Sequence, residues 1–223
     1  MKKNLLRLVI ILALAVVIYR PGLALATTIY NFDDITLTQN AGSWDYLPTS
    51  YQGLTWTGFE VISQNVGTYA YKNYGNTNTF PSGTQAAYNG GTGGYKTVTI
   101  DFGGLTDVQS AYFSAWASSD HLGPYSASQL TINGYNGTSL VGSQVVTLTA
   151  NFALTPINLG GLVTRITFTK AEPDLDNHYW LMDDLQVNGA PIPPTVLLLL
   201  SGLAGLGLLH RRQGAGRCRR GSS

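Results

Sequence analysis

Short runs of alternating apolar and polar residues recur through the middle of the chain, separated by clusters of Gly, Asn, Ser and Pro. A period of two is typical of half-buried β-strands, and no apolar stripe with a helical period extends far enough to predict a helix there. We expect about eight strands: Thr28–Thr38, Gly53–Ser63, Tyr95–Phe102, Ser110–Ala117, Gln129–Tyr135, Ser143–Thr149, Thr164–Lys170 and Trp180–Asn188. Their number and spacing predict an all-β fold, with a single β-sandwich or jelly-roll domain over residues 27–189.

Two connecting segments of this domain differ from the rest. Asn133-Gly134 and Asn136-Gly137 flank Tyr135 between two strand runs, which predicts a turn with left-handed residues. Gln64–Gly94 is a longer irregular stretch rich in Gly, Asn, Thr and Tyr. A loop of that length in a compact domain is usually functional or mobile.

The two ends of the chain carry long apolar runs instead. Residues 1–26 combine a basic start, an apolar run and Ala24-Leu25-Ala26, the pattern of a cleaved secretory signal peptide with a signal helix; a retained anchor is the alternative. At the other end, an apolar segment follows Pro191-Ile192-Pro193-Pro194 and closes with Arg211-Arg212. Arginines after an apolar segment predict a transmembrane helix with its basic end in the cytoplasm.

The proline-rich start, the Leu-Leu-Ser-Gly-Leu-Ala-Gly-Leu core and the arginine end make residues 190–213 resemble a PEP-CTERM sorting signal, found on exported proteins of Gram-negative bacteria. The family motif is Pro-Glu-Pro, and this chain has the variant Pro191-Ile192-Pro193. The resemblance implies processing by an exosortase, a membrane transpeptidase-like protease. The residues that mark the signal are Pro191, Pro193, Pro194, Arg211 and Arg212. A plain single-pass anchor is the alternative, and residues 214–223 are predicted to be a disordered basic tail.

Three short motifs extend the resemblance into the central domain: Asn31–Ile35, Tyr51–Trp56 and Leu181–Val187. They resemble the jelly-roll ectodomains that are often joined to PEP-CTERM tails. This implies a fold and a location, but no reaction. We therefore expect export across the inner membrane with the help of signal peptidase, a membrane-anchored intermediate, and a final place at the cell surface or outside the cell.

The charges are divided between the same segments. The whole chain has a formal net charge of +1, yet residues 27–189 hold all 12 acidic side chains and only four basic ones, a net charge of −8. A domain of that charge repels phosphates, so we expect no nucleic-acid partner. The single cysteine, Cys218, lies in the tail and excludes a disulfide framework.

Two aspartate pairs, Asp33-Asp34 and Asp183-Asp184, lie in the first and last predicted strands. We expect Asp183 to point into the core, since it has the same parity as Leu181, Leu185 and Val187. A buried carboxylate without a partner is costly. First and last strands are commonly neighbours in jelly rolls, so our hypothesis is a structural Ca²⁺ site that uses one or both residues of each pair. The alternative is that these acids lie in water at strand ends.

Aromatic residues are the other resource of the domain. Six are expected in the core: Trp56, Phe59, Phe102, Phe113, Phe168 and Trp180. Seven lie in predicted loops: Trp44, Tyr46, Tyr51, Tyr69, Tyr71, Tyr74 and Tyr125. Exposed flat rings beside Asn and Gln can bind sugars. Our candidate ligand-binding residues are Trp44, Tyr46, Tyr51, Tyr71 and Tyr74, with an extracellular polysaccharide as the partner.

Catalytic patterns are weak. The chain has no Gly-x-Ser-x-Gly motif, and its only glutamates are Glu60, expected to face out of a strand, and Glu172. Asp174–His178 does not fit an EF-hand loop and is interpreted as a solvated acidic loop. Two function classes remain: a non-enzymatic cell-surface or extracellular-matrix protein delivered by the sorting signal, and a carbohydrate-binding or carbohydrate-acting module of the matrix.

Overall fold

The computed structural model describes residues 27–74, 79–91, 94–118, 121–122, 124–174 and 176–189. The predicted signal peptide, sorting signal, transmembrane helix and basic tail lie outside these residues. Within them the chain forms strands and one 3-10 helix, η1 (Tyr71–Tyr74), and no helix there has the length and apolar character to cross a membrane. The prediction of an all-β domain over this range is confirmed, but the described residues form fourteen strands instead of about eight.

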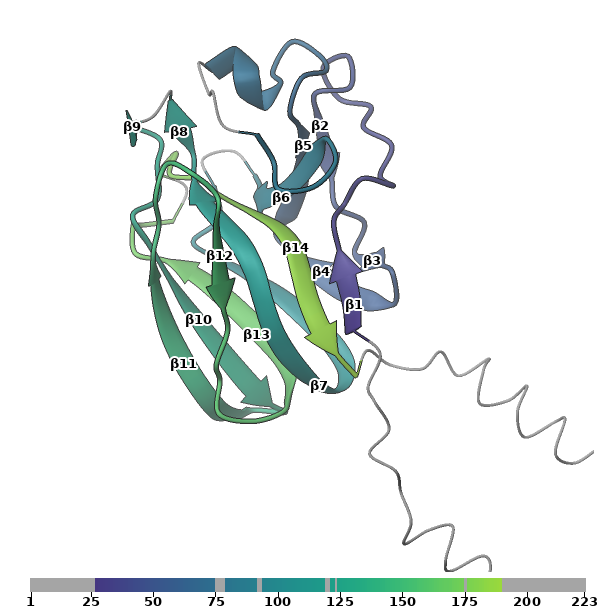
Figure 1. Cartoon of the computed structure of the whole chain (residues 1–223), viewed down its shortest axis with the longest axis vertical. Helices are drawn as coiled ribbons and strands as arrows, with labels where there is room; N and C mark the ends of the chain where they lie inside the picture. The colour runs from purple at the N-terminus through teal and green to yellow at the C-terminus, as the bar shows by residue number, and fades with distance from the viewer. Residues whose placement is uncertain are drawn as a thin grey trace, which may run out of the picture.

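The strands form two antiparallel layers joined by one long strand (Figure 1). The first layer has the order β3 (Ser50–Tyr51), β4 (Leu54–Thr57), the first half of β7 (Thr97–Ala115), β13 (Val163–Lys170), β10 (Gln129–Asn136) and β11 (Ser139–Thr147). The second has the order β12 (Ala153–Pro156), the second half of β7, β14 (Trp180–Asn188), β6 (Gln85–Asn89), β5 (Phe59–Ser63) and β2 (Trp44–Tyr46). β1 (Thr27–Tyr30) pairs with the end of β14, and β8 (Ala117–Ser118) pairs only with β9 (His121–Leu122).

Strand β7 unites two segments that the sequence separates. The predicted strands Tyr95–Phe102 and Ser110–Ala117 are one strand of 19 residues, which pairs with β13 in its first half and with β14 in its second. Gly103 has a φ of 65°, and β7 changes partners just beyond it. A glycine adopts that backbone without steric cost, so the pattern of a turn residue occurs here inside a strand.

The main core lies between the two layers. Phe168 of β13 packs on Phe113 of β7 and Trp180 of β14, with ring centroids 5.8 and 5.4 Å apart. All six aromatic residues predicted for the core are buried there, which confirms that prediction. The predicted turn is present at Asn136-Gly137, because β10 ends at Asn136 and Gly137 has a φ of 60°. Asn133 and Gly134 lie inside β10, so the prediction is wrong for them.

A second, smaller core covers the outer face of the second layer. Its buried members are Ile62, Tyr71, Phe80, Ala86, Tyr88, Trp116 and Leu181. The stretch Gln64–Gly94, expected to be an irregular loop, contributes η1 and strand β6 to this cluster. Because both faces of β5 are covered, all five of its residues are buried.

The ends of the described domain lie together. Thr27 of β1 pairs with Asn188 of β14. In Figure 1 the start of β1 and the end of β14 are at one end of the sandwich, and η1, β2 and the β8–β9 hairpin are at the other.

Candidate functional site: an aromatic pocket

A pocket of about 400 Å³ opens on the second core. Its volume lies within the ~300–1,000 Å³ range of sites that bind small ligands. Strands β5 and β6 and the turn after β6 supply Ile62, Tyr88 and Gly91. Two further sets of residues complete the lining. The Ser43 group is Asn40, Trp44 and Tyr69, and the Tyr179 group is Trp116, Tyr125, Asn177 and Tyr179.

The Ser43 group is held by one buried hydroxyl. Ser43 Oγ donates to the carbonyl of Asn40 at 2.7 Å and accepts from the backbone N–H of Tyr69 at 2.8 Å. A Cβ at Gly67 would lie 2.2 Å from this oxygen, and Gly67 has a φ of 87°, so only glycine fits there. Two segments far apart in sequence are thereby fixed beside each other.

The Tyr179 group is held by main-chain hydrogen bonds. The N–H of Tyr179 donates to the carbonyl of Tyr125 at 2.8 Å, and its own carbonyl accepts from the N–H groups of Trp116 at 3.1 Å and Ala127 at 3.0 Å. The ring of Tyr179 lies 5.5 Å from Trp116 and 6.1 Å from Tyr88. Three aromatic residues from three separate segments therefore have fixed positions before any ligand arrives.

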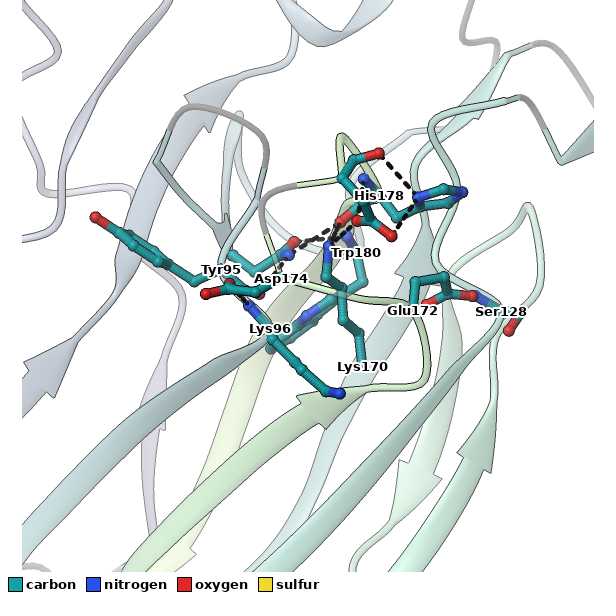
Figure 2. Close-up of polar contacts among 10 residues, drawn as sticks. Tyr95, Lys96, Ser128, Lys170, Glu172, Asp174, His178 and Trp180 are labelled. Carbon is teal, nitrogen blue, oxygen red and sulfur yellow. Dashed lines mark hydrogen bonds and ion pairs between the residues drawn. The ribbon is translucent and has the colours of Figure 1, made fainter.

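A buried lysine anchors the segment that carries Asn177 and Tyr179 (Figure 2). Lys170, at the end of β13, is 1% exposed, and its ammonium forms an ion pair with Asp176 and donates to the carbonyl of His178 at 3.0 Å. Asn89 Nδ2 donates to the same carbonyl at 3.1 Å. We call Lys170, Asp176 and the His178 carbonyl the Lys170 anchor. The interpretation of Asp174–His178 as a solvated acidic loop is therefore wrong for Asp176.

The charge of Asp176 is favoured by this arrangement. Burial alone would raise the pKa of Asp176, but hydrogen bonds from Lys170 and from His178 hold it below its ordinary value. An ion pair removed from water is stable only when further hydrogen bonds satisfy its members. The His178 carbonyl meets that need for Lys170 and the backbone N–H of His178 meets it for Asp176.

Glu60 lies directly behind the lining of the pocket. It faces out of β5 as expected, but it is buried rather than exposed. Its carboxylate accepts from the hydroxyl of Tyr88 and from the N–H of Gly91, the latter at 2.7 Å. A Cβ at Gly90 would lie 2.2 Å from Glu60 Cγ, so this close approach requires glycine. Glu60 thus orients the Tyr88 hydroxyl and the Gly91 turn.

The structure divides the five predicted ligand-binding aromatics. Trp44 lines the pocket, and Tyr46 is 63% exposed with its ring 5.5 Å from Trp44. The prediction of exposed faces is wrong for Tyr51 and Tyr71, because both side chains are buried in the two cores. The side chain of Tyr74 lies outside the described part.

Other lining residues were only partly recognisable. Tyr69 and Tyr125 are loop aromatics in the sequence, and both are about half exposed. Trp116 resembles a core residue at the end of a predicted strand, and nothing in the sequence brings it to Tyr179. One sequence signal could have indicated its role, namely the series of aromatic residues in Gln64–Gly94 together with Tyr125. Aromatic rings in loops outside the sandwich are expected to pack on a further aromatic surface, and Trp116 is part of that surface.

Three of the four paired aspartates gather beneath the segment Ser82–Gln85; we call Asp33, Asp183 and Asp184 the carboxylate cluster. Asp33 Oδ1 accepts from the backbone N–H groups of Thr84 at 2.7 Å and Gln85 at 3.1 Å. Asp183 is fully buried and accepts from the backbone N–H groups of Ser82 at 3.1 Å and Asp184 at 2.8 Å. Burial, with the charges of Asp184 and Asp33, raises the pKa of Asp183 to about 8.

Asp183 is buried on a different side of the sheet from the one predicted. Trp180 and Met182 face the main core, whereas Leu181 belongs to the second core. Asp184 has a φ of 48°, and the pairing of β14 with β7 shifts register between Asp183 and Gln186. This bulge reverses the alternation, so Leu185 and Val187 return to the main core and their parity with Asp183 is misleading.

The fourth aspartate, Asp34, lies apart. It accepts from the hydroxyl of Tyr51 at 2.6 Å and from Gln52 Nε2 at 3.1 Å. Burial, together with the hydrogen bond to Asp34 and its charge, raises the pKa of Tyr51. Among the described residues no group of three or more His, Cys, Asp or Glu side chains meets the geometry of a metal site. The calcium hypothesis stays a prediction, with Asp33, Asp183 and Asp184 as its candidates.

Comparisons with known proteins give structural similarity alone. No family model matches the chain, and no curated protein matches it. The K2 cleaved adhesin domain of Lys-gingipain is 15% identical, covers 73% of this chain and 99% of its own, and has a TM-score of 0.43. A mutant of a family 29 carbohydrate-binding module is 11% identical, with coverages of 73% and 89% and a TM-score of 0.35. The module TmCBM61 in complex with β-1,4-galactotriose is 11% identical, with coverages of 64% and 97% and a TM-score of 0.33.

Proposed function

We propose that residues 27–189 are a carbohydrate-binding module and that the aromatic pocket is its binding site. The main support is a preformed pocket whose lining contains two Trp residues, four Tyr residues and two asparagines. Pyranose rings have apolar C–H faces that pack on aromatic rings and hydroxyl edges that hydrogen-bond to amides. Hydrogen bonds of Ser43 and of the Tyr179 main chain fix the segments that carry these rings. Little ordering of the protein is therefore required on binding.

Binding, rather than hydrolysis, is the role that the lining favours. Glycoside hydrolysis uses two carboxyl groups on either side of the scissile bond. The described lining residues include no Asp or Glu. Glu60, behind the lining, is buried and engaged by Tyr88 and Gly91.

The location proposed for this module is the cell surface or the extracellular matrix, after delivery by the sorting signal. An anchor in residues 190–213 would follow the end of β14. That end lies opposite β2 and the β8–β9 hairpin, near which the pocket residues Trp44 and Trp116 are found (Figure 1). The pocket would then face away from the membrane, toward extracellular polymer.

The test is retention of the full-length chain on a panel of immobilised polysaccharides, in a detergent without a sugar headgroup. We expect one or more matrices to retain the chain, and Trp44→Ala to reduce retention at least tenfold. Tyr135→Ala is the matched control, because Tyr135 lies on β10, where its ring contacts Arg165 and is not part of the pocket. Absence of retention on every matrix would contradict the proposal and favour a surface protein without a glycan ligand.

A further inference from the structure

We infer that the pocket selects uncharged sugars and that Asn40 and Asn177 are the side chains that set this selectivity. The inference rests on the proposed function and names the class of ligand for the same site. It is carried by the uncharged side chains of the described lining and by two asparagine amides that form no hydrogen bond among the described residues.

The described lining of the pocket has no side chain that would pair with an anionic sugar. None of the described lining residues is Lys, Arg, Asp or Glu. Lys170, which anchors the neighbouring segment, is already paired with Asp176. Glu60 lies behind Tyr88 and Gly91, and the domain has a net charge of −8. A uronate or sulfate would therefore lose its hydration and meet a negative field without a compensating cation from the described lining.

The two asparagines offer the hydrogen bonds that a neutral sugar needs. Both are exposed and line the pocket, Asn40 in the Ser43 group and Asn177 in the Tyr179 group. No hydrogen bond among the described residues uses either side-chain amide. An amide both donates and accepts, as a sugar hydroxyl does, whereas a carboxylate only accepts. Two amides on separate segments can thus bind two hydroxyls of a ligand in the pocket.

Both asparagines also have left-handed backbones, with φ of 48° at Asn40 and 64° at Asn177. Residues other than glycine are uncommon in this region, and Asn is among the few that tolerate it. Glycine would fit both positions with less strain, and it would remove both amides. Asparagine tolerates these turns as glycine does, and it adds an amide that glycine lacks.

The experiment compares one polymer in two chemical forms. Any neutral polysaccharide that retains the full-length chain is derivatised to the same degree with hydroxyethyl groups, which are neutral, or with carboxymethyl groups, which are anionic. We expect the hydroxyethyl form to retain the chain at least tenfold more strongly at low salt, and the difference to shrink as salt is added. Asn40→Gly and Asn177→Gly should each weaken retention on the neutral form about tenfold, with no loss of thermal stability.

Three results separate the possible failures. Equal or stronger retention on the carboxymethyl form would overturn the inference and leave the proposed function intact. Unchanged binding by both glycine variants would overturn the role of the asparagines. Absence of retention on every underivatised polysaccharide would contradict the proposed function itself. Asn177→Ser is a second variant for the case in which Asn177→Gly lowers the melting temperature.

Discussion

Two buried ionisable side chains in this domain, Lys170 and Asp183, are treated in opposite ways by their surroundings. Lys170 faces an acidic partner, Asp176, and a carbonyl that accepts its second hydrogen bond. Asp183 has neutral N–H donors, and its charged neighbours are the like-charged Asp184 and Asp33. The pKa values reflect this difference, because that of Asp176 is lowered and that of Asp183 is raised to about 8.

The two sites therefore differ in whether their charges are compensated: those of the Lys170 anchor are, and those of the carboxylate cluster are not. The Lys170 anchor satisfies its own charges and thereby fixes the segment that presents Asn177 and Tyr179 to the pocket. The carboxylate cluster can be stabilised by taking up a proton or a cation. We therefore expect changes to the anchor to disturb the pocket, and changes to the cluster to alter how stability depends on pH and on calcium.

Asp176→Asn should have the largest effect. It would leave the Lys170 ammonium buried without its counter-charge, and removing one partner of a buried ion pair costs about 3–5 kcal/mol of unfolding free energy. Urea unfolding of the full-length chain measures the loss, and glycan retention should fall with it.

Lys170→Met should cost less than Asp176→Asn, because the side chain of Asp176 is 21% exposed and can be hydrated. The double variant Lys170→Met/Asp176→Asn should recover much of the stability, since it leaves no buried charge without a partner. If Asp176→Asn were no worse than Lys170→Met, the anchor would not hold a desolvated charge.

The calcium hypothesis predicts stabilisation through the carboxylate cluster and no effect at the Lys170 anchor. A ligand that binds the native state at 100 times its Kd stabilises it by about 2.7 kcal/mol. Melting temperatures in millimolar calcium and in chelator would therefore differ by several degrees, and Asp183→Asn would abolish the difference. Asp107→Asn is the control, because Asp107 is at the start of the β7 segment that pairs with β14, away from Ser82. Identical melting curves would remove the calcium hypothesis.

Stability in the absence of calcium should decrease from pH 4 to pH 8. The raised pKa of Asp183 means that the folded state binds more protons than the unfolded chain, whose aspartates have pKa values of about 3.9. Stability from this group is present below that value and is lost as pH rises through about 8, with a slope of at most about 1.4 kcal/mol per pH unit. Asp183→Asn should flatten this slope in denaturant titrations, whereas Asp34→Asn should preserve it.

The sequence predicts the sandwich better than the site, for physical reasons. Alternation depends on neighbouring residues, so strands such as β10, β13 and β14 are visible in it, and so are core aromatics such as Phe168. The pocket depends on contacts between distant segments, such as Ser43 with Tyr69 and Tyr179 with Trp116. No periodicity encodes those contacts.

The position of Asp183 shows a second limit. Parity predicts its face correctly only while the strand alternates without interruption, and the bulge at Asp184 breaks that alternation. The sequence gives no sign of the Lys170–Asp176 pair either, because Asp176 follows Lys170 by six positions in an apparent surface loop and the two meet at a buried strand end.

Tryptophan emission during titration with a retained oligosaccharide tests the glycan pocket most directly. Trp44 and Trp116 line the pocket, whereas Trp56 and Trp180 are buried in the main core. We predict a saturable change in emission that is lost in Trp44→Phe and Trp116→Phe combined, while Trp56 and Trp180 still report a folded domain. Saturable binding with the same emission change in that double variant would contradict the account, because the glycan would then bind elsewhere.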